Sequence, residues 1–429
     1  MALLSSTAFA NTNSEIAELK EKLADIESNQ QVLIDETSSL KTGFDTVDIS
    51  FSHNGMGPAA SKVYSSKTPL SIGGYGDIYV KSPDKGQGKA KADVNHFVAY
   101  VGYKFSDSII LNTELEFEHG GSNAEAAANG GGKNNAAAEG YAIAEFMYLD
   151  FLIDKTFNVE IGKTLIPMGL INLRHEPVLF NTIHKPLVEL FIIPSTWSAT
   201  GVNSYGSFDD IGISYNAGIT QALELNNADN GTSSQIENSV ASPTGKTNIV
   251  KVAFVGRLDY TGVNGLLAGA SIYYGDATQG SVRGSSALIY DIHAVYQLSG
   301  FKLKALYSAS SISNAENIAS KIDSNPNSSM KSSNGYYVNI EYDVLASFET
   351  TQKFPLFIQY DHLNPAATVV DKFGVTTGSN IGETTTTTFG VNYFPQEQVT
   401  FKLDYAMTNF ATASKIDYNT LSVALGFLF

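Results

Sequence analysis

The sequence contains no cysteine, one tryptophan and only three arginines among its 429 residues. The absence of cysteine excludes disulfide bonds, thiolate metal sites and cysteine nucleophiles. Charged residues make up 16% of the chain, well below the share of about a quarter that is usual in soluble proteins. The net charge is −16, and with so few arginines (Arg174, Arg257 and Arg283) we expect no nucleic-acid partner.

Long hydrophobic runs are also missing. No stretch approaches the roughly 18 consecutive apolar residues that a membrane-spanning helix requires. The apolar content is nevertheless an ordinary 43%, with 37 Gly, 22 Tyr and 24 Phe, and the mean hydropathy is −0.06. This composition leaves two classes of protein, a large secreted β protein or a transmembrane β-barrel.

Residues 1–10 predict the end of a secretory signal peptide. This short apolar stretch ends in Ala8-Phe9-Ala10, the small-x-small pattern that signal peptidase accepts, although no basic residues precede it. A disordered N-terminus is the alternative interpretation. If the signal is real, the mature chain begins near Asn11 and has left the cytoplasm.

Residues 11–42 predict a helix that forms a coiled coil. From Ile16 to Leu40, positions with 3-4 spacing are apolar except for Gln30 and Thr37, which suit a short oligomeric coil. Because an isolated helix of this length is marginally stable, its apolar stripe needs a partner. We expect the helix to associate with copies of itself, with packing on the body of the protein as the alternative. Residues 43–69 are expected to be a linker.

From Leu70 to Phe429 the hydrophobic pattern has a period of two. Short turns alternate with long polar loops, which is typical of outer-membrane barrels with periplasmic turns and extracellular loops. We therefore predict an all-β fold, a 16-stranded antiparallel transmembrane β-barrel over residues 70–429, in the outer membrane of a Gram-negative bacterium. Its lipid partners would include lipopolysaccharide. The predicted strands are 70–80, 93–106, 108–118, 140–153, 156–164, 199–208, 210–220, 248–260, 263–274, 286–299, 301–312, 335–346, 354–364, 383–394, 397–409 and 417–429.

The third long loop, residues 165–198, is more apolar than the other loops and contains four prolines. An apolar loop exposed to water is costly, so we expect it to fold inward against the barrel wall and narrow the pore. The alternative is that several of its charges pair with each other and only anchor the loop. The side chains predicted to line the constriction are Arg174, His175, Glu176, His184, Lys185 and Glu189.

Residues 161–206 resemble the phosphate-selective porin family in its broad sense. The resemblance rests on GKTLIPMGL after a strand, and on the motifs N-x-x-H-E-P, K-P-x-V-E and I-I-P-S-T-W. It implies a 16-stranded channel that forms a homotrimer through its barrel walls, in some members with a periplasmic N-terminal coiled coil. The phosphate-selective members conduct anions along a ladder of Arg and Lys, and three arginines cannot build such a ladder. We therefore do not expect phosphate specificity.

The alternation of apolar and polar residues along the strands also predicts a lumen lined mostly by acidic side chains. This lining suggests a function. We expect passive diffusion of small hydrophilic solutes and ions, with a weak cation preference or none. The seven histidines show no metal-ligand spacing, and no nucleophile motif is present, so we assign no catalytic, metal or cofactor site. A protein that tethers the envelope to peptidoglycan through its coil and a barrel hydrolase are the alternative functions. Side chains assigned to the lumen wall include Asp77, Glu114, Glu116, Lys251, Arg257, Lys302, Lys304, Glu341 and Asp404.

Overall fold

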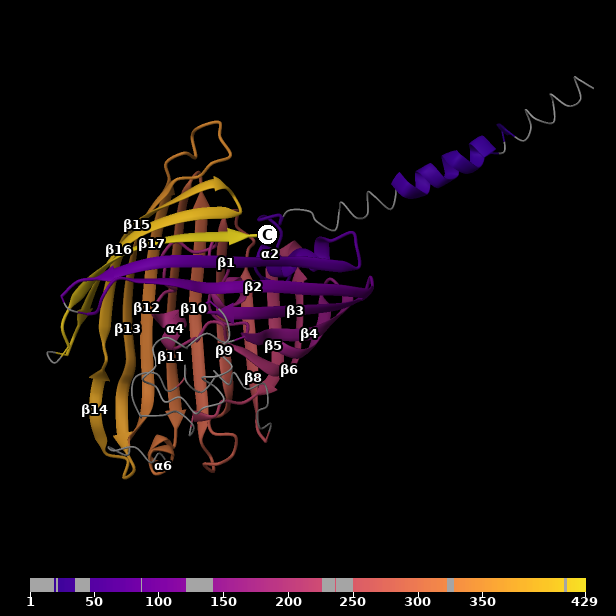
Figure 1. The fold of residues 1–429 in the computed structure, drawn as a ribbon. Helices are drawn as coiled ribbons and strands as arrows, with labels where there is room; N and C mark the ends of the chain where they lie inside the picture. Colours follow the sequence, from indigo (N-terminus) through magenta and orange to yellow (C-terminus); the bar gives the residue numbers. More distant parts are fainter. Residues whose placement is uncertain are drawn as a thin grey trace, which may run out of the picture.

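The computed structural model describes residues 19, 20, 22–34, 47–85, 87–120, 142–225, 236, 250–321, 328–412 and 415–429. Within these residues, sixteen antiparallel strands close into a barrel, because β1 pairs with both β2 and β17 (Figure 1). A seventeenth strand, β14, pairs with the end of β13, while β13 and β15 pair directly within the wall. The predicted fold class and strand number are therefore confirmed.

The strands follow the chain order around the barrel, and each wall strand corresponds to one predicted segment. They are β1 (Leu70–Pro83), β2 (Lys91–Ser106), β3 (Ile109–Glu118), β4 (Ala142–Asp154), β5 (Phe157–Leu165), β6 (Ser198–Phe208), β7 (Ile213–Gln221), β8 (Val252–Tyr260), β9 (Leu266–Asp276), β10 (Ser286–Leu298), β11 (Phe301–Ser313), β12 (Ser328–Asp343), β13 (Pro355–Asp371), β14 (Thr376–Ile381), β15 (Thr384–Gln396), β16 (Val399–Phe410) and β17 (Tyr418–Leu428).

The largest departures from the predicted bounds occur at β12, β13 and β14. β12 begins at Ser328 instead of residue 335, and β13 ends at Asp371 instead of residue 364. These extensions pair with each other, and β14 pairs with the extension of β13, at the same end of the barrel as helix α6 (Ala315–Ala319) (Figure 1). β14 is mostly polar and largely exposed, so it lacks the alternation that marks the wall strands.

The two faces of the wall differ as a barrel in lipid requires. On β16, Phe401, Leu403 and Tyr405 are 41–50% exposed on the outside, whereas Lys402 and Asp404 between them are 4–5% exposed. Charged side chains therefore point into the lumen and apolar side chains point outward. This pattern confirms the alternation predicted for this strand.

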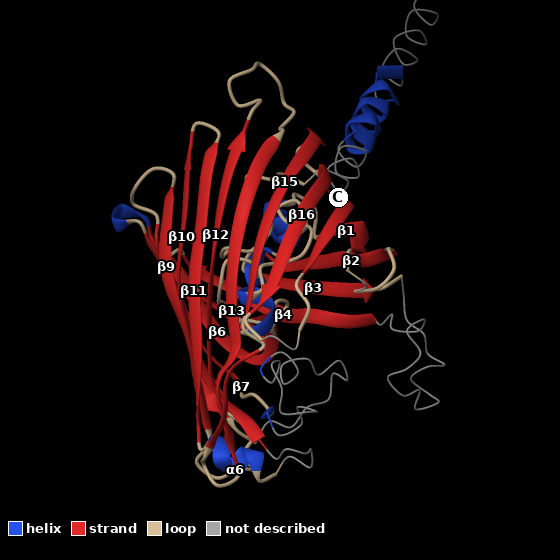
Figure 2. Cartoon of the chain, turned by 90° about the vertical axis from the view of Figure 1, so that its left-hand side faces the viewer, coloured by secondary structure: helices blue, strands red, loops and turns tan. Residues whose placement is uncertain are grey.

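The hydrophobic core of the protein lies inside the barrel, in two clusters. In one cluster, the third long loop packs against lumen-facing side chains such as Tyr273 on β9 and Tyr337 on β12. In the other, Met56 and Ala60 pack against side chains of β1, β2 and β4, including Tyr100. Two segments therefore lie inside the barrel and pack against different strands of its wall, and Figure 2 shows chain within the barrel.

The second of these segments is the region predicted to be a linker. Residues 47–69 include helix α2 (Pro58–Ser65), which packs on the lumen face of β1, β2 and β3. The Asn112 side chain on β3 donates a hydrogen bond to the carbonyl of Ala60 (2.9 Å), and the Tyr64 hydroxyl donates to Asp150 Oδ2 on β4 (2.9 Å). The prediction of a simple linker is wrong here, because small residues in α2 allow close approach to the wall.

Residues 22–34 are helical and lie within the predicted coiled coil. Leu23, Ile26 and Leu33 are 57–61% exposed in the single chain. No helix among the described residues is long and apolar enough to cross a membrane. The remaining short helices are η1 (Asn172–Arg174), α4 (Val188–Phe191) and η2 (Asp209–Ile211).

Candidate functional site

The third long loop, which connects β5 to β6, is closed at its base by Asn172. The side-chain amide donates to the carbonyls of Ile166 (2.7 Å) and Trp197 (2.9 Å), and its Oδ1 accepts from the Trp197 N–H (2.7 Å). Asn172 is completely buried. Asn172 is not among the predicted site residues, because the motif N-x-x-H-E-P does not show which backbone groups the Asn172 side chain contacts.

From this base the loop extends across the lumen to the opposite wall. The Lys402 ammonium on β16 donates to the carbonyls of Phe180 (2.7 Å) and Thr182 (3.0 Å). The Lys304 ammonium on β11 donates to the carbonyl of Leu179 (2.9 Å). Two lumen-facing lysines therefore hold three backbone carbonyls of the loop, within residues 179–182, from the far side of the barrel.

Carboxylates of the wall hold the N–H groups of the same loop. Asp404 on β16 accepts from the N–H of Ile183 (2.8 Å), and Asp361 on β13 accepts from that of Leu187 (3.1 Å). A buried backbone polar group needs such a partner, because leaving it unpaired costs about as much as a lost hydrogen bond. Lys304 and Asp404, which were predicted as lumen wall, therefore face the lumen but act there as loop anchors.

Two of the six residues predicted at the constriction connect the loop to the β1–β4 side. His175 Nε2 lies 3.1 Å from Glu114 Oε1 on β3. Glu176 accepts hydrogen bonds from the N–H groups of Ala59 (3.1 Å) and Ala60 (3.0 Å) in α2. Both side chains are buried. They join the loop, the wall and the N-terminal segment into one unit, so their predicted exposure to the pore is wrong.

A third predicted residue, Glu189, is also an anchor. Its carboxylate accepts from the N–H groups of Leu170 (2.9 Å) and Ile171 (2.7 Å) and from the hydroxyl of Tyr337 on β12 (2.7 Å). Glu189 has no exposed surface. A buried charge requires this kind of pairing. The alternative interpretation, in which charges of the loop only anchor it, therefore applies to His175, Glu176 and Glu189.

The other three predicted residues keep accessible surface. His184 is exposed and packs edge-on against the ring of Tyr79 on β1, with the ring centroids 5.1 Å apart. Arg174 and Lys185 are partly exposed. Among the six predicted residues, these three are the ones with accessible side chains.

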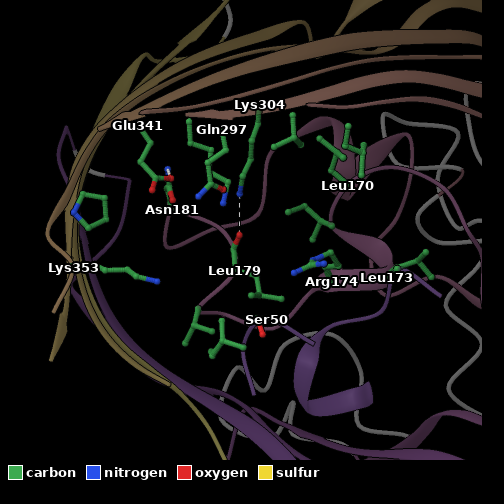
Figure 3. A pocket seen from close by; sticks show the side chains of 18 of the residues that line it. Ser50, Leu170, Leu173, Arg174, Leu179, Asn181, Gln297, Lys304, Glu341 and Lys353 are labelled. Atoms are coloured by element: carbon green, nitrogen blue, oxygen red, sulfur yellow. Dashed lines mark hydrogen bonds between the residues drawn. The ribbon is translucent and has the colours of Figure 1, made fainter. Parts of the chain in front are cut away.

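Arg174 borders a cavity of about 600 Å³ between the loop and the wall (Figure 3). Two of the three arginines of the chain lie here, together with three lysines and four carboxylates. The second arginine, Arg257 on β8, donates to the carbonyl of Gly169 (2.5 Å) and to Asp259 Oδ2 (2.7 Å). The charged lining residues are Arg174, Arg257, Lys302, Lys304, Lys353, Asp259, Glu341, Asp343 and Glu397.

The remaining lumen-wall predictions divide into two groups. Asp77, Glu114 and Glu116 are buried on the lumen face of β1 and β3, and Glu341 on β12 accepts from the loop side chain Asn181 (2.8 Å). Lys251 differs, because it precedes β8 and its side chain is exposed. Among the described residues, buried carboxylates on the strands outnumber the buried Arg257 and Lys402. These carboxylates are Asp77, Glu114, Glu116, Glu145, Asp150, Glu160, Asp291, Asp361 and Asp404.

Comparisons with known proteins agree with this architecture. No protein-family model matches the sequence. An uncharacterized protein of Aquifex aeolicus (strain VF5) is 30% identical over 383 residues, which cover 87% of this chain and 83% of that protein.

Solved structures with the same type of fold are outer-membrane proteins. An anion-selective porin from Comamonas acidovorans has a TM-score of 0.52 at 13% identity, covering 84% of this chain and 99% of the porin. Salmonella typhi OmpF in complex with daunomycin has a TM-score of 0.52 at 13% identity, covering 84% and 97%. A loop L8 deletion mutant of OmpT, an outer membrane protein of Vibrio cholerae, has a TM-score of 0.50 at 10% identity, covering 84% and 99%. These similarities show the porin fold of an outer-membrane protein.

Proposed function

We propose that this chain, which belongs to the same family as the Aquifex aeolicus protein, is a porin that lets small hydrophilic solutes and ions diffuse passively across the outer membrane. The observation that carries the proposal is the third loop, which crosses a closed 16-stranded barrel and borders a charged cavity of about 600 Å³. A barrel of this size leaves an aqueous lumen that inward-folded segments can narrow. We propose no catalytic activity, and we place the chain within the broad phosphate-selective porin family without its phosphate specificity.

The charges support a weak preference for cations. The lumen face carries many buried carboxylates and few buried bases, whereas the cavity beside the loop has nearly equal numbers of both. A wall with excess negative charge raises the local concentration of cations. Arg174, His184 and Lys185 would form the constriction, and Arg174 would oppose the preference.

Planar-bilayer recordings test the channel. We expect discrete current steps from the purified full chain, and a reversal potential in a salt gradient that corresponds to a cation-to-anion permeability ratio of about two to three. Absence of discrete steps would contradict the channel, whereas anion selectivity would contradict only the cation preference.

A pair of charge variants locates the constriction in the same recordings. Arg174→Gln removes a positive charge beside the loop, so we expect the permeability ratio to rise. Lys251→Gln removes the same charge from an exposed position that does not line the cavity, and it should leave the ratio unchanged. Equal shifts for the two variants would place the selective region elsewhere.

We also propose that the chain forms a homotrimer through its barrel walls and its N-terminal coil in the periplasm. The exposed apolar stripe of residues 22–34 supports this proposal, because burying such side chains stabilises an assembly. The same exposed helix favours a second candidate role, attachment of the barrel to peptidoglycan.

The double variant Leu23→Glu/Leu33→Glu separates these two roles. We expect it to weaken the trimer in size-exclusion chromatography with light scattering, since a charge in an apolar seam disfavours helix association. The conductance of each barrel should stay unchanged. Trimers that persist while the protein no longer co-sediments with cell walls would favour tethering over assembly.

A further inference from the structure

Three side chains with metal-ligand chemistry meet on the lumen face of β2 and β3. His96 on β2 lies opposite Glu118 on β3 in the strand register, and Glu116 is two residues earlier on the same face of β3. His96 Nε2 is 3.8 Å from Glu116 Oε1 and 3.8 Å from Glu118 Oε1. One ligand atom from each residue lies within 4.8 Å of the other two.

The distances between His96 Nε2 and the two glutamate oxygens are too long for hydrogen bonds. They are typical of atoms that coordinate the same metal ion. A hydrogen bond between nitrogen and a carboxylate oxygen spans roughly 2.7–3.2 Å. Three atoms at the observed separations can each lie roughly 2.2–2.4 Å from a common centre, close to the bond lengths of about 2.0–2.2 Å that zinc makes with histidine and carboxylate. The three groups therefore converge on a position that an ion can occupy.

The other nitrogen of His96 is held as in many metal sites. His96 Nδ1 is 2.6 Å from Asp77 Oδ1 on β1, and Asp77 Oδ2 accepts from Asn95 Nδ2 (2.9 Å). Because an ionised carboxylate only accepts hydrogen bonds, the imidazole donates from Nδ1 to Asp77. The Asn95 amide nitrogen, 2.8 Å from the same Nδ1, then donates to Asp77 and not to the ring. In the neutral ring this leaves the lone pair of Nε2 directed at two carboxylates, an arrangement that a bound cation stabilises.

Glu116 provides an independent indication of a ligand. It is 1% exposed, and its Oε2 has no hydrogen-bond partner among the described residues. Burying a carboxylate with one oxygen unsatisfied is costly, and a cation coordinated by the group lowers that cost.

We propose that His96, Glu116 and Glu118 bind a divalent transition-metal ion, with Asp77 orienting the histidine. One nitrogen and two carboxylate donors suit zinc-like ions, with water completing the coordination, whereas calcium and magnesium prefer sites built from oxygen alone. His96 lies 20 and 22 positions before Glu116 and Glu118 in the sequence, so the site depends on the pairing of β2 with β3. It does not depend on the proposed channel activity.

Zinc binding to the full-length protein, purified in detergent without a histidine tag, tests the proposal. Equilibrium dialysis with metal analysis should show one high-affinity zinc ion per chain. His96→Gln and Glu116→Gln should each weaken this binding at least about tenfold. Glu116→Gln keeps the size of the side chain and removes a buried charge, so it is the variant expected to keep the barrel folded.

His362→Gln is the matched control. His362 Nε2 also faces a glutamate, Glu383, at 3.0 Å, but no second carboxylate completes a three-ligand group there among the described residues. The zinc affinity of the His362→Gln variant should equal that of the unmodified chain. A chain that does not bind zinc, variants at His96 and Glu116 that retain full affinity, an equal loss in the control, or displacement by millimolar magnesium would each overturn the site.

Discussion

Deleting residues 47–66 is expected to raise the conductance of a single barrel by roughly two-fold or more. This segment lies inside the lumen, where α2 packs on β1, β2 and β3 and Glu176 of the third loop binds its backbone. Its removal widens the aqueous path and frees one side of the loop. Single-channel recordings at fixed salt concentration measure the effect directly.

A deletion of residues 14–34 is the control for this experiment. It removes the predicted coil and keeps the lumenal segment, so the conductance of each barrel should not change. Circular dichroism and heat-modifiable migration in gels verify that both deletion variants remain folded barrels. A folded barrel without residues 47–66 that conducts like the intact protein would show that this segment does not restrict the pore.

The substitution Asn172→Ala is expected to lower the stability of the third loop by about 1–3 kcal/mol, the cost of one buried backbone group left without a partner. The Trp197 N–H loses its partner, whereas the carbonyls of Ile166 and Trp197 each lose the amide and keep one backbone hydrogen bond, from Met168 and Ile166 respectively. We expect a lower thermal unfolding midpoint and noisier open-channel current, since the loop is then closed less firmly at its base.

Asn264→Ala provides the comparison, because Asn264 is exposed in the short turn between β8 and β9. This change should alter neither the midpoint nor the current noise. If Asn172→Ala behaves in the same way as Asn264→Ala, the hydrogen bonds at the base of the loop do not hold it in place.

In the third long loop, the types of residue in the sequence predict some structural roles but not others. Its apolar character predicts that it needs a partner surface, and its charges predict polar contacts inside the barrel. Which charges stay accessible was not predictable, because Glu189 and Arg174 look alike as isolated charged residues in an apolar loop. Glu189 is buried against Tyr337 on β12, whereas Arg174 borders the cavity.

The sequence by itself determined the barrel, its strand number and, for regularly alternating strands such as β16, the side that faces lipid. The physical reason is that lipid on one side and a polar lumen on the other impose a local period of two, which neighbouring residues such as Leu403 and Asp404 already display. Only the tertiary structure decided what fills the lumen. The entry of residues 47–69, the anchoring of the loop and the meeting of His96 with Glu116 and Glu118 all depend on strand pairing and chain reversal. These contacts join residues far apart in the sequence, and no local pattern records them.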